Sequence, residues 1–506
     1  MPVSKKTTTT TTKTSPVPYW KSECGRAVVY VGDCLDVMLQ MDHDQFHAIV
    51  TDPPYGLEFM GKAWDAPWKN EGVIETCNEE TSVSHPFRDG TQRVRYGNNR
   101  ARKVEARQRR ADELTDESKR RYIATSVEYV RDSHLYQKWF MERAKAMLRV
   151  AKPGAHLLSF GGTRMWHRMT CSIEDAGFDI RDTIMWVYGS GFPKSHNVSK
   201  AIDKMLGAER EVVGEWNMPG RSSRSGEKEL YRLTNDSGNI TTPTTEEAKQ
   251  WSGFGTSLKP SYEPIVLARK PLVGSVAENT LAHGCGGLNI DECRVGSTGG
   301  TASAGQPNYL NNVYGNGMGG LDILDAGKGR WPANLIHDGS DEVVDLFPAQ
   351  AGGGGADRER IPATDSGNAL NLNTEGSTFA NGVGHGDSGS AARFFYCAKA
   401  DSDDRPHGKS AVGHPTVKPL DLMRYLVRLV CARGGVVLDP FMGSGSTGCA
   451  AIAEGMYFVG IEQSQEYADI AVGRLKLALK DAPVTDKLES GKVATKNKPP
   501  AQNVWE

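Results

Sequence analysis

The sequence predicts an α/β fold built on a doubly wound, mostly parallel sheet, and two observations support this prediction. Short apolar runs alternate with helical patterns of ten or more residues, which is the spacing that parallel crossovers require. Acidic residues and glycines directly follow several of these runs, as expected where parallel strands end at a ligand-binding edge.

The expected elements follow one another in chain order. Strands at 27–33 and 48–52 flank a helix around 35–40, and a longer helix from Tyr136 is expected to stop at Pro153 and Gly154. The later elements are strand 155–162, helix 165–179, strand 180–189, helix 419–435, strand 436–441, helix 445–456, strand 457–463 and helix 464–480. Segments 186–195 and 262–271 are expected to form an antiparallel hairpin at the sheet edge.

Composition favours a soluble, cytoplasmic protein. The net charge is −2, so any contact with nucleic acid must come from local basic patches rather than from a uniformly basic surface. The nine cysteines form no CxxC pair and are expected to be reduced. Only the stretch 283–293 has a spacing that suggests metal ligands, and it lacks tight pairs, so no metal is predicted. No apolar run approaches the ~20 residues that span a bilayer.

The chain divides by composition into five parts. The polar termini, 1–20 and 481–506, are expected to be disordered tails. Between them lie two α/β blocks, 21–271 and 396–480, which must share one sheet because the second is too small to stand alone. Residues 272–395 are rich in glycine and are expected to form an irregular recognition region. An arginine-rich loop at 85–122 and an insertion at 195–258 interrupt the first block.

The stretch FHAIVTDPPYG, residues 46–56, ends an apolar run in a rigid turn. Pro53 and Pro54 fix φ near −65° and remove two backbone donors, so the chain cannot continue a regular strand ladder here. The turn therefore presents the Asp52 carboxylate, free backbone carbonyls and the Tyr55 ring. These groups can accept hydrogen bonds and stack on a flat ring.

The stretch VVLDPFMGSGSTG, residues 436–448, combines a strand, an acidic residue, a glycine-rich turn and the start of a helix. Glycines allow backbone amides to approach a ligand closely at a helix N-terminus. The turn lacks the Lys-Ser/Thr pair of a P-loop, and its glycines do not have the GxGxxG spacing. Glu462 ends the next strand, where an acidic residue usually binds ribose hydroxyls.

Four motifs in one order, GDCLD, TDPPYG, HPTVKP and LDPFMGSGSTG, resemble an amino-group DNA methyltransferase that depends on S-adenosylmethionine. The catalytic motif precedes the cofactor motif, as in the circularly permuted group called the β class. The resemblance covers about residues 30–479 and implies a Rossmann-like fold. No nuclease-like cluster stands out, so an orphan or phage-associated enzyme is expected.

The resemblance assigns roles to individual residues. The catalytic residues it implies are Asp52, Pro53, Pro54 and Tyr55. The cofactor-binding residues it implies are Asp33, Thr416, Lys418, Asp439, Pro440, Phe441, Gly443, Ser444, Gly445, Thr447 and Glu462. Asp52 and the Pro53 carbonyl would accept hydrogen bonds from the target amino group, and Tyr55 would stack on the flipped base.

The implied substrate is double-stranded DNA, with adenine N6 as the target because an aspartate leads the catalytic tetrad. Cytosine N4 is the main alternative; an RNA or protein substrate, or an inactive DNA-binding regulator, is less favoured. The arginine-rich loop is the expected DNA contact, although it could instead be a solvated loop. Its candidate residues are Arg93, Arg95, Arg100, Arg102 and Lys103. A homodimer, encoded by a bacterium or phage and associated with the nucleoid, is also expected.

Overall fold

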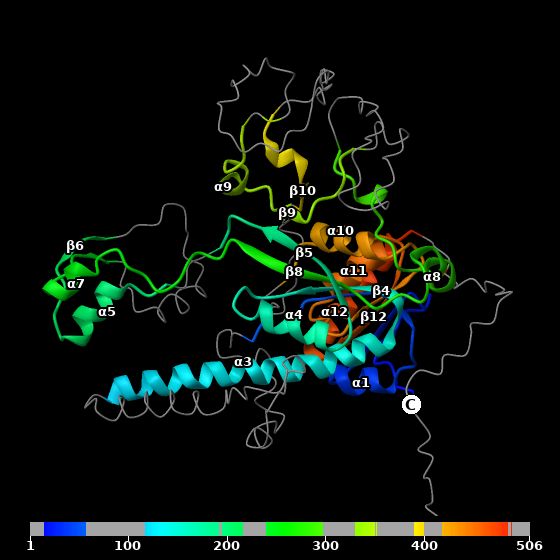
Figure 1. Ribbon diagram of the computed structural model, residues 1–506, viewed down its shortest axis with the longest axis horizontal. Coiled ribbons are helices and arrows are strands. Elements are labelled where there is room, and N and C mark those ends of the chain that lie inside the picture. The colour runs from blue at the N-terminus through cyan, green and yellow to red at the C-terminus, as the bar shows by residue number, and fades with distance from the viewer. Residues whose placement is uncertain are drawn as a thin grey trace, which may run out of the picture. The chain divides into compact units, whose positions relative to one another are not determined.

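The computed structural model describes residues 15–56, 117–191, 195–215, 239–296, 329–349, 351, 389–398, 417–483 and 487, with backbone alone for 117–132 and 215. Its centre is a ten-stranded sheet of order β1-β2-β12-β11-β3-β4-β8-β5-β9-β10 (Figure 1). The strands are β1 (Trp20–Lys21), β2 (Ala27–Val31), β3 (Phe46–Thr51), β4 (Ala151–Phe160), β5 (Asp179–Val187), β8 (Tyr262–Arg269), β9 (Leu335–His337), β10 (Tyr396–Cys397), β11 (Val436–Asp439) and β12 (Tyr457–Glu462).

The sheet is mostly parallel, as predicted. Neighbouring strands from β2 to β4 run parallel, as do β5, β9 and β10, whereas β1 is antiparallel to β2 and β8 is antiparallel to β4. Every residue of β3 and β11 is buried, which is typical of central strands covered on both faces. These two strands precede the two motifs that the sequence singles out.

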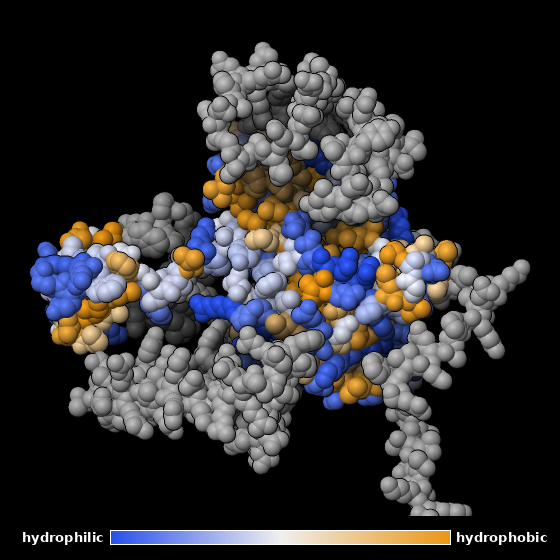
Figure 2. Space-filling view, viewed as in Figure 1, coloured by the Kyte–Doolittle hydropathy of each residue, from blue (hydrophilic) through white to orange (hydrophobic). Residues whose placement is uncertain are grey.

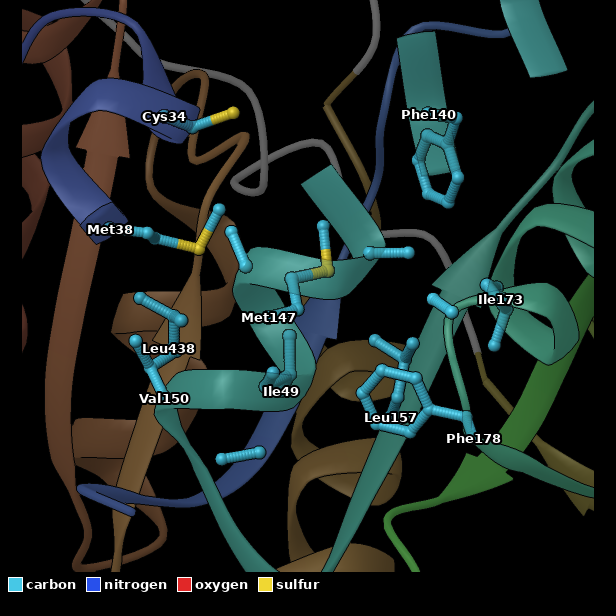
Figure 3. Packing of buried hydrophobic residues seen from close by; sticks show 14 of the residues in the cluster. Cys34, Met38, Ile49, Phe140, Met147, Val150, Leu157, Ile173, Phe178 and Leu438 are labelled. Carbon is cyan, nitrogen blue, oxygen red and sulfur yellow. The ribbon is translucent and has the colours of Figure 1, made fainter. Parts of the chain in front are cut away.

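Helices cover the sheet on both sides. In Figure 1, α1 (Cys34–Gln40), α3 (Glu117–Val150) and α4 (Trp166–Asp175) lie on one side, and α10 (Leu420–Val430) and α11 (Ser446–Ala453) lie on the other. α12 (Gln465–Lys480) packs against α11 and β2. Figure 3 shows Met147 and Val150 of α3 beside Ile49 and Leu438 of the central strands. The fold is therefore α/β, and both sequence blocks contribute to one sheet.

The long helix begins and ends earlier than the sequence predicts, since α3 starts at Glu117 and not at Tyr136. α3 stops at Val150, and Pro153 and Gly154 lie inside β4. The amides of Asp44 and Gln45 donate hydrogen bonds to the carbonyls of Arg149 and Val150, and Ala151 pairs with Phe46. The chain after Val150 therefore joins the sheet beside β3 and does not continue the helix. The proline and the glycine then fall where the register between β3 and β4 shifts.

Two further predictions need correction at the sheet edges. β8 and β5 are neighbours as expected, but β9 and β10 continue the sheet beyond β5, so the pair is not at the edge. Strands of three and two residues are too short to give a periodic sequence signal. At the opposite edge Trp20 belongs to β1, and the Tyr19 amide bonds the carbonyl of Val29, so order begins before residue 21.

The described parts of 272–395 contain several short elements besides β9. These are α8 (Val276–His283), the 3-10 helices η5 (Asp291–Cys293) and η7 (Ala391–Phe394), and α9 (Asp341–Val344). α8 packs on β4 because Asn279, which is fully buried, donates to the carbonyls of Pro153 and Cys285. The domain boundaries and the recognition role of this region stay predictions.

Residues 188–262 form a second compact unit. It holds α5 (Val198–Met205), β6 (Val212–Glu215), β7 (Asn239–Thr241) and α7 (Glu246–Gln250), and β6 and β7 pair with each other. Buried Asp203 joins α5 to the start of α7 by accepting from Thr245 and pairing with Arg210 at 2.8 Å. Trp251 and Phe254 are exposed hydrophobic side chains of this unit. Figure 2 shows hydrophobic residues on the visible surface of the protein. Such a small unit buries only a limited core.

In the part of the chain that the structure describes, no helix is both long enough and apolar enough to cross a membrane.

Candidate active site

Asp439, the last residue of β11, is a buried hydrogen-bond acceptor. Its side chain accepts from the Thr51 hydroxyl at 2.7 Å, from the Thr447 hydroxyl at 2.6 Å and from the Phe441 amide at 3.1 Å. Burial raises the pKa of Asp439 to about 7, although these hydrogen bonds partly offset the effect. The bond from Thr51 joins the residue before Asp52 to the glycine-rich turn, across 388 positions of sequence.

Glu462 holds the glycine-rich turn in place. One carboxylate oxygen accepts from the Gly443 amide at 2.8 Å and the other from the Ser464 amide at 2.9 Å. Burial raises the pKa of Glu462, and the backbone donors oppose that shift. Gly443 and Gly445 have φ of 52° and 83°, which is the left-handed region that glycine adopts without strain.

The other predicted members of the turn are well packed. Pro440 is buried, and buried Ser444 is bound by Arg474, which donates to its carbonyl at 2.9 Å and to its hydroxyl at 3.0 Å. Phe441 lies against Phe140 and Trp139 of α3, with ring centroids 6.5 and 5.9 Å apart.

Asp33 lies next to this turn at the end of β2. It caps α1 by accepting from the Leu35 amide at 2.7 Å and forms an ion pair with Arg143 of α3 at 2.8 Å. The Gly32 amide bonds the carbonyl of Glu462 at 3.0 Å, which holds the ends of β2 and β12 side by side. Asp33, Asp439 and Glu462 therefore lie at the carboxyl ends of three adjacent parallel strands, β2, β11 and β12.

The turn of Asp52 to Tyr55 is the predicted catalytic turn, and it contacts the buried Lys418. The Lys418 ammonium lies 2.7 Å from Asp52 Oδ2, 3.1 Å from Glu263 Oε2 and 3.2 Å from the Tyr55 hydroxyl. The Tyr55 hydroxyl donates to Glu263 at 2.9 Å. Burial alone would lower the pKa of Lys418, but the two carboxylates raise it above its ordinary value, so the ammonium stays charged.

Two further features of this turn bear on its chemistry. Burial, together with Asp52 and Glu263, raises the pKa of Tyr55 well above its ordinary value, so the phenol stays protonated. Asp52 Oδ1 is buried and, among the described residues, has no hydrogen-bond partner. Asp52 thus has one oxygen engaged by Lys418 and one acceptor position open.

The sequence did not single out Glu263, Arg143 or Arg474. Glu263 is a charged residue in an otherwise apolar strand, which is a weak signal for a residue that turns inward. Arg143 and Arg474 lie in helices with several other charged residues, so the sequence carries no signal that separates them. Thr416 and the predicted DNA-contact residues Arg93, Arg95, Arg100, Arg102 and Lys103 lie outside the described residues. In the described ranges, no group of three or more His, Cys, Asp or Glu residues could hold a metal ion.

A family model described as DNA methylase matches residues 46–271 and 357–473, which include the catalytic turn and the glycine-rich turn. The chain belongs to the DNA methylase family. This methylase is 21% identical over 454 residues to the type II methyltransferase M.HindIII of Haemophilus influenzae, covering 88% of this chain and 94% of that protein. It acts on DNA as an amino-group methyltransferase, of the kind that modifies adenine N6 or cytosine N4.

A shorter stretch of the methylase has a more similar relative. Over 65 residues, or 13% of this chain and 22% of the relative, it is 45% identical to the DNA adenine methyltransferase YhdJ of Escherichia coli. Among solved structures, it matches the cytosine-N4-specific PvuII DNA methyltransferase with 10% identity and a TM-score of 0.37, over 91% of this chain and 89% of that one. The M1.HpyAVI–SAM complex matches with 14% identity and a TM-score of 0.32, over 89% and 98%.

Proposed function

We propose that this methylase transfers a methyl group from S-adenosylmethionine to the exocyclic N6 of adenine in double-stranded DNA, after the base is flipped out of the helix. The observation that carries the proposal is the state of Asp52. Its Oδ2 is held by Lys418, and its buried Oδ1 has no partner among the described residues. An unpaired buried acceptor is costly, and an incoming amino group would supply the missing donor.

The residues at the strand ends suit S-adenosylmethionine. Glu462 and Asp33 would bind the ribose hydroxyls and the adenine end, and the turn of Asp439, Gly443 and Gly445 would surround the methionine end. When bound, the cofactor supplies an activated methyl group on a cationic sulfonium. Acidic side chains along this edge suit that charge.

The chemistry that remains for the protein is positioning. The amino nitrogen of adenine is a poor nucleophile, because its lone pair is delocalised into the ring. Asp52 Oδ1 and the Pro53 carbonyl would accept its two N–H groups and favour a more tetrahedral nitrogen with an available lone pair. Tyr55 would stack on the flipped base, and its hydroxyl bond to Glu263 fixes the ring.

Two features favour adenine over cytosine. Asp52 leads the DPPY tetrad, and the YhdJ protein, whose name specifies adenine, is 45% identical over the stretch it shares with this chain. The transfer of that specificity to this chain is part of the proposal.

Nucleoside mass spectrometry tests the reaction directly. DNA incubated with the protein and S-adenosylmethionine is digested, with Asp52→Ala and the isosteric Asp52→Asn as matched variants. We expect N6-methyladenine from the wild type and a loss of about 10²-fold or more in both variants, as for removal of a preorganised polar group. Cofactor titration checks that the variants still bind S-adenosylmethionine. N4-methylcytosine in place of N6-methyladenine would contradict the proposed base.

The partner predictions rest on the sequence. The arginine-rich segment at 85–122 was predicted to be a loop, but its residues 117–122 belong to α3. This segment and the region 272–395 are proposed to contact DNA, and a homodimer is proposed as the assembly. A salt titration of DNA affinity with Arg93, Arg95 and Arg100 changed to Gln would test the loop, because each lost phosphate contact lowers the salt slope by about one.

A further inference from the structure

Glu263 lies outside every motif of the sequence, yet it is bound to the catalytic turn. It belongs to β8, next to the pairing of Ile265 with Phe160 of β4. Its side chain is 21% exposed and contacts both the Tyr55 hydroxyl and the Lys418 ammonium.

Asp52, Tyr55, Glu263 and Lys418 form a cluster in which two carboxylates face one ammonium. One ammonium, on Lys418, is shared between two carboxylates, Asp52 and Glu263, whose side chains are 20% and 21% exposed. Lys418 also donates to the Tyr55 hydroxyl and lies 4.9 Å from the ring centroid of Phe160. With Glu263 as a second acceptor, Lys418 is held between the two acids and does not neutralise Asp52 alone.

We propose that Glu263 is a positioning residue for methyl transfer. It fixes the Tyr55 ring through the phenol and shares the Lys418 ammonium with Asp52, so that Asp52 is only partly neutralised and keeps Oδ1 free and electron-rich for the target amino group. This inference rests on the proposed function, because it assigns the role of Asp52 as acceptor. Glu263 itself contacts no reacting atom in this arrangement.

The change Glu263→Gln removes the charge and keeps the size of the side chain. The Lys418 ammonium then has Asp52 as its only carboxylate partner in the cluster, and Tyr55 loses a charged acceptor. We expect kcat to fall about tenfold or more, since a partly buried charge-assisted hydrogen bond is lost, while KM for S-adenosylmethionine stays within about twofold. Glu142→Gln is the matched control, because Glu142 and Lys145 form an ion pair with side chains about half exposed.

A double-mutant cycle separates positioning from a structural role. Tyr55→Phe keeps the ring and removes the hydroxyl that joins Glu263 and Lys418. If Glu263 acts through this hydroxyl and the ammonium, the double variant loses little more kcat than the worse single variant. Additive losses, or a loss that follows a lower melting temperature, would overturn the proposal.

A spectroscopic measurement keeps the test independent of catalysis. The Cε resonance of Lys418 in protein labelled with ¹³C-lysine is assigned by its absence in Lys418→Met. We expect Glu263→Gln to shift this resonance and Glu142→Gln to leave it in place; an unchanged resonance would also overturn the proposal. A wild type that makes N4-methylcytosine, or no methylated base, while the resonance still shifts, contradicts the proposed function and not the positioning role.

Discussion

At the scale of single residues, Asp439 links folding to pH. Burial raises its pKa to about 7, above the ordinary value of 3.8, so the folded state binds a proton more tightly than the unfolded chain does. The contribution of Asp439 to stability is therefore fully present below about pH 4 and is lost as pH rises through 7. We expect the melting temperature of the wild type relative to Asp439→Asn to decrease between pH 5 and pH 8.

The measured quantity is the melting temperature of the wild type minus that of Asp439→Asn at each pH. Other groups titrate in the same pH range, but their effects are common to both proteins and cancel in this difference. A difference that stays flat or rises with pH would contradict this prediction, and a flat difference would mean that Asp439 is ionised throughout this range. In that case the bonds from Thr51, Thr447 and the Phe441 amide would outweigh burial.

At the scale of elements, α11, the helix after the glycine-rich turn, has no room for a larger side chain at Gly448. A Cβ at Gly448 of α11 would lie 2.6 Å from Leu475 of α12 and 2.6 Å from the Phe458 ring of β12. We expect Gly448→Ala to destabilise the protein by about 1–3 kcal/mol, as overpacking of a tight interior does. Thermal unfolding monitored by circular dichroism measures the effect.

Gly473 of α12 is the matched control for Gly448. It is also a helical glycine, but nothing lies within 4 Å of a Cβ placed there. We expect Gly473→Ala to be neutral or to stabilise by up to about 1 kcal/mol, because alanine favours the helix more than glycine does. Equal effects of the two changes would show that helix propensity, and not packing, governs both positions.

Element types proved easier to predict than their ends and their neighbours. Apolar runs such as 457–462 and helical spacing such as 465–480 carry the local signal, and the structure confirms both elements. The end of α3 at Val150 depends on backbone bonds to residues 44–46, which no local pattern records. β9 and β10 depend on pairing alone, because they are too short for periodicity.

In the candidate site, too, the sequence predicted local features and missed contacts between distant residues. The catalytic turn and the glycine-rich turn were predicted because each has rigid, unusual local chemistry. Glu263 is a single acid in a strand, and it meets Tyr55 only after a separation of 208 residues is closed by the fold. The cofactor role predicted for Lys418 stays a prediction. In the structure its ammonium contacts Asp52, Glu263 and Tyr55 and lies near the Phe160 ring.

At the scale of the whole molecule, the site is assembled from the two ends of the chain. Thr51 bonds Asp439, and Lys418 pairs with Asp52 across 366 positions. These contacts, together with the parallel pairing of β3 and β11, require the two sequence blocks to fold as one body. The unit at 188–262 contributes none of Asp33, Asp52, Glu263, Lys418, Asp439 or Glu462.

This division predicts that the second unit can be removed without loss of the proposed cofactor site. The chain enters and leaves the unit at adjacent points, because the Tyr188 amide bonds the Ser261 carbonyl at 2.9 Å. A two-residue turn in place of residues 190–259 should therefore close the gap. We expect the shortened protein to bind S-adenosylmethionine, by calorimetry, with a Kd within about threefold of the wild type. Glu462→Ala in the shortened protein is the negative control, and an aggregated or non-binding deletion would mean that residues 188–262 are required to fold the sheet.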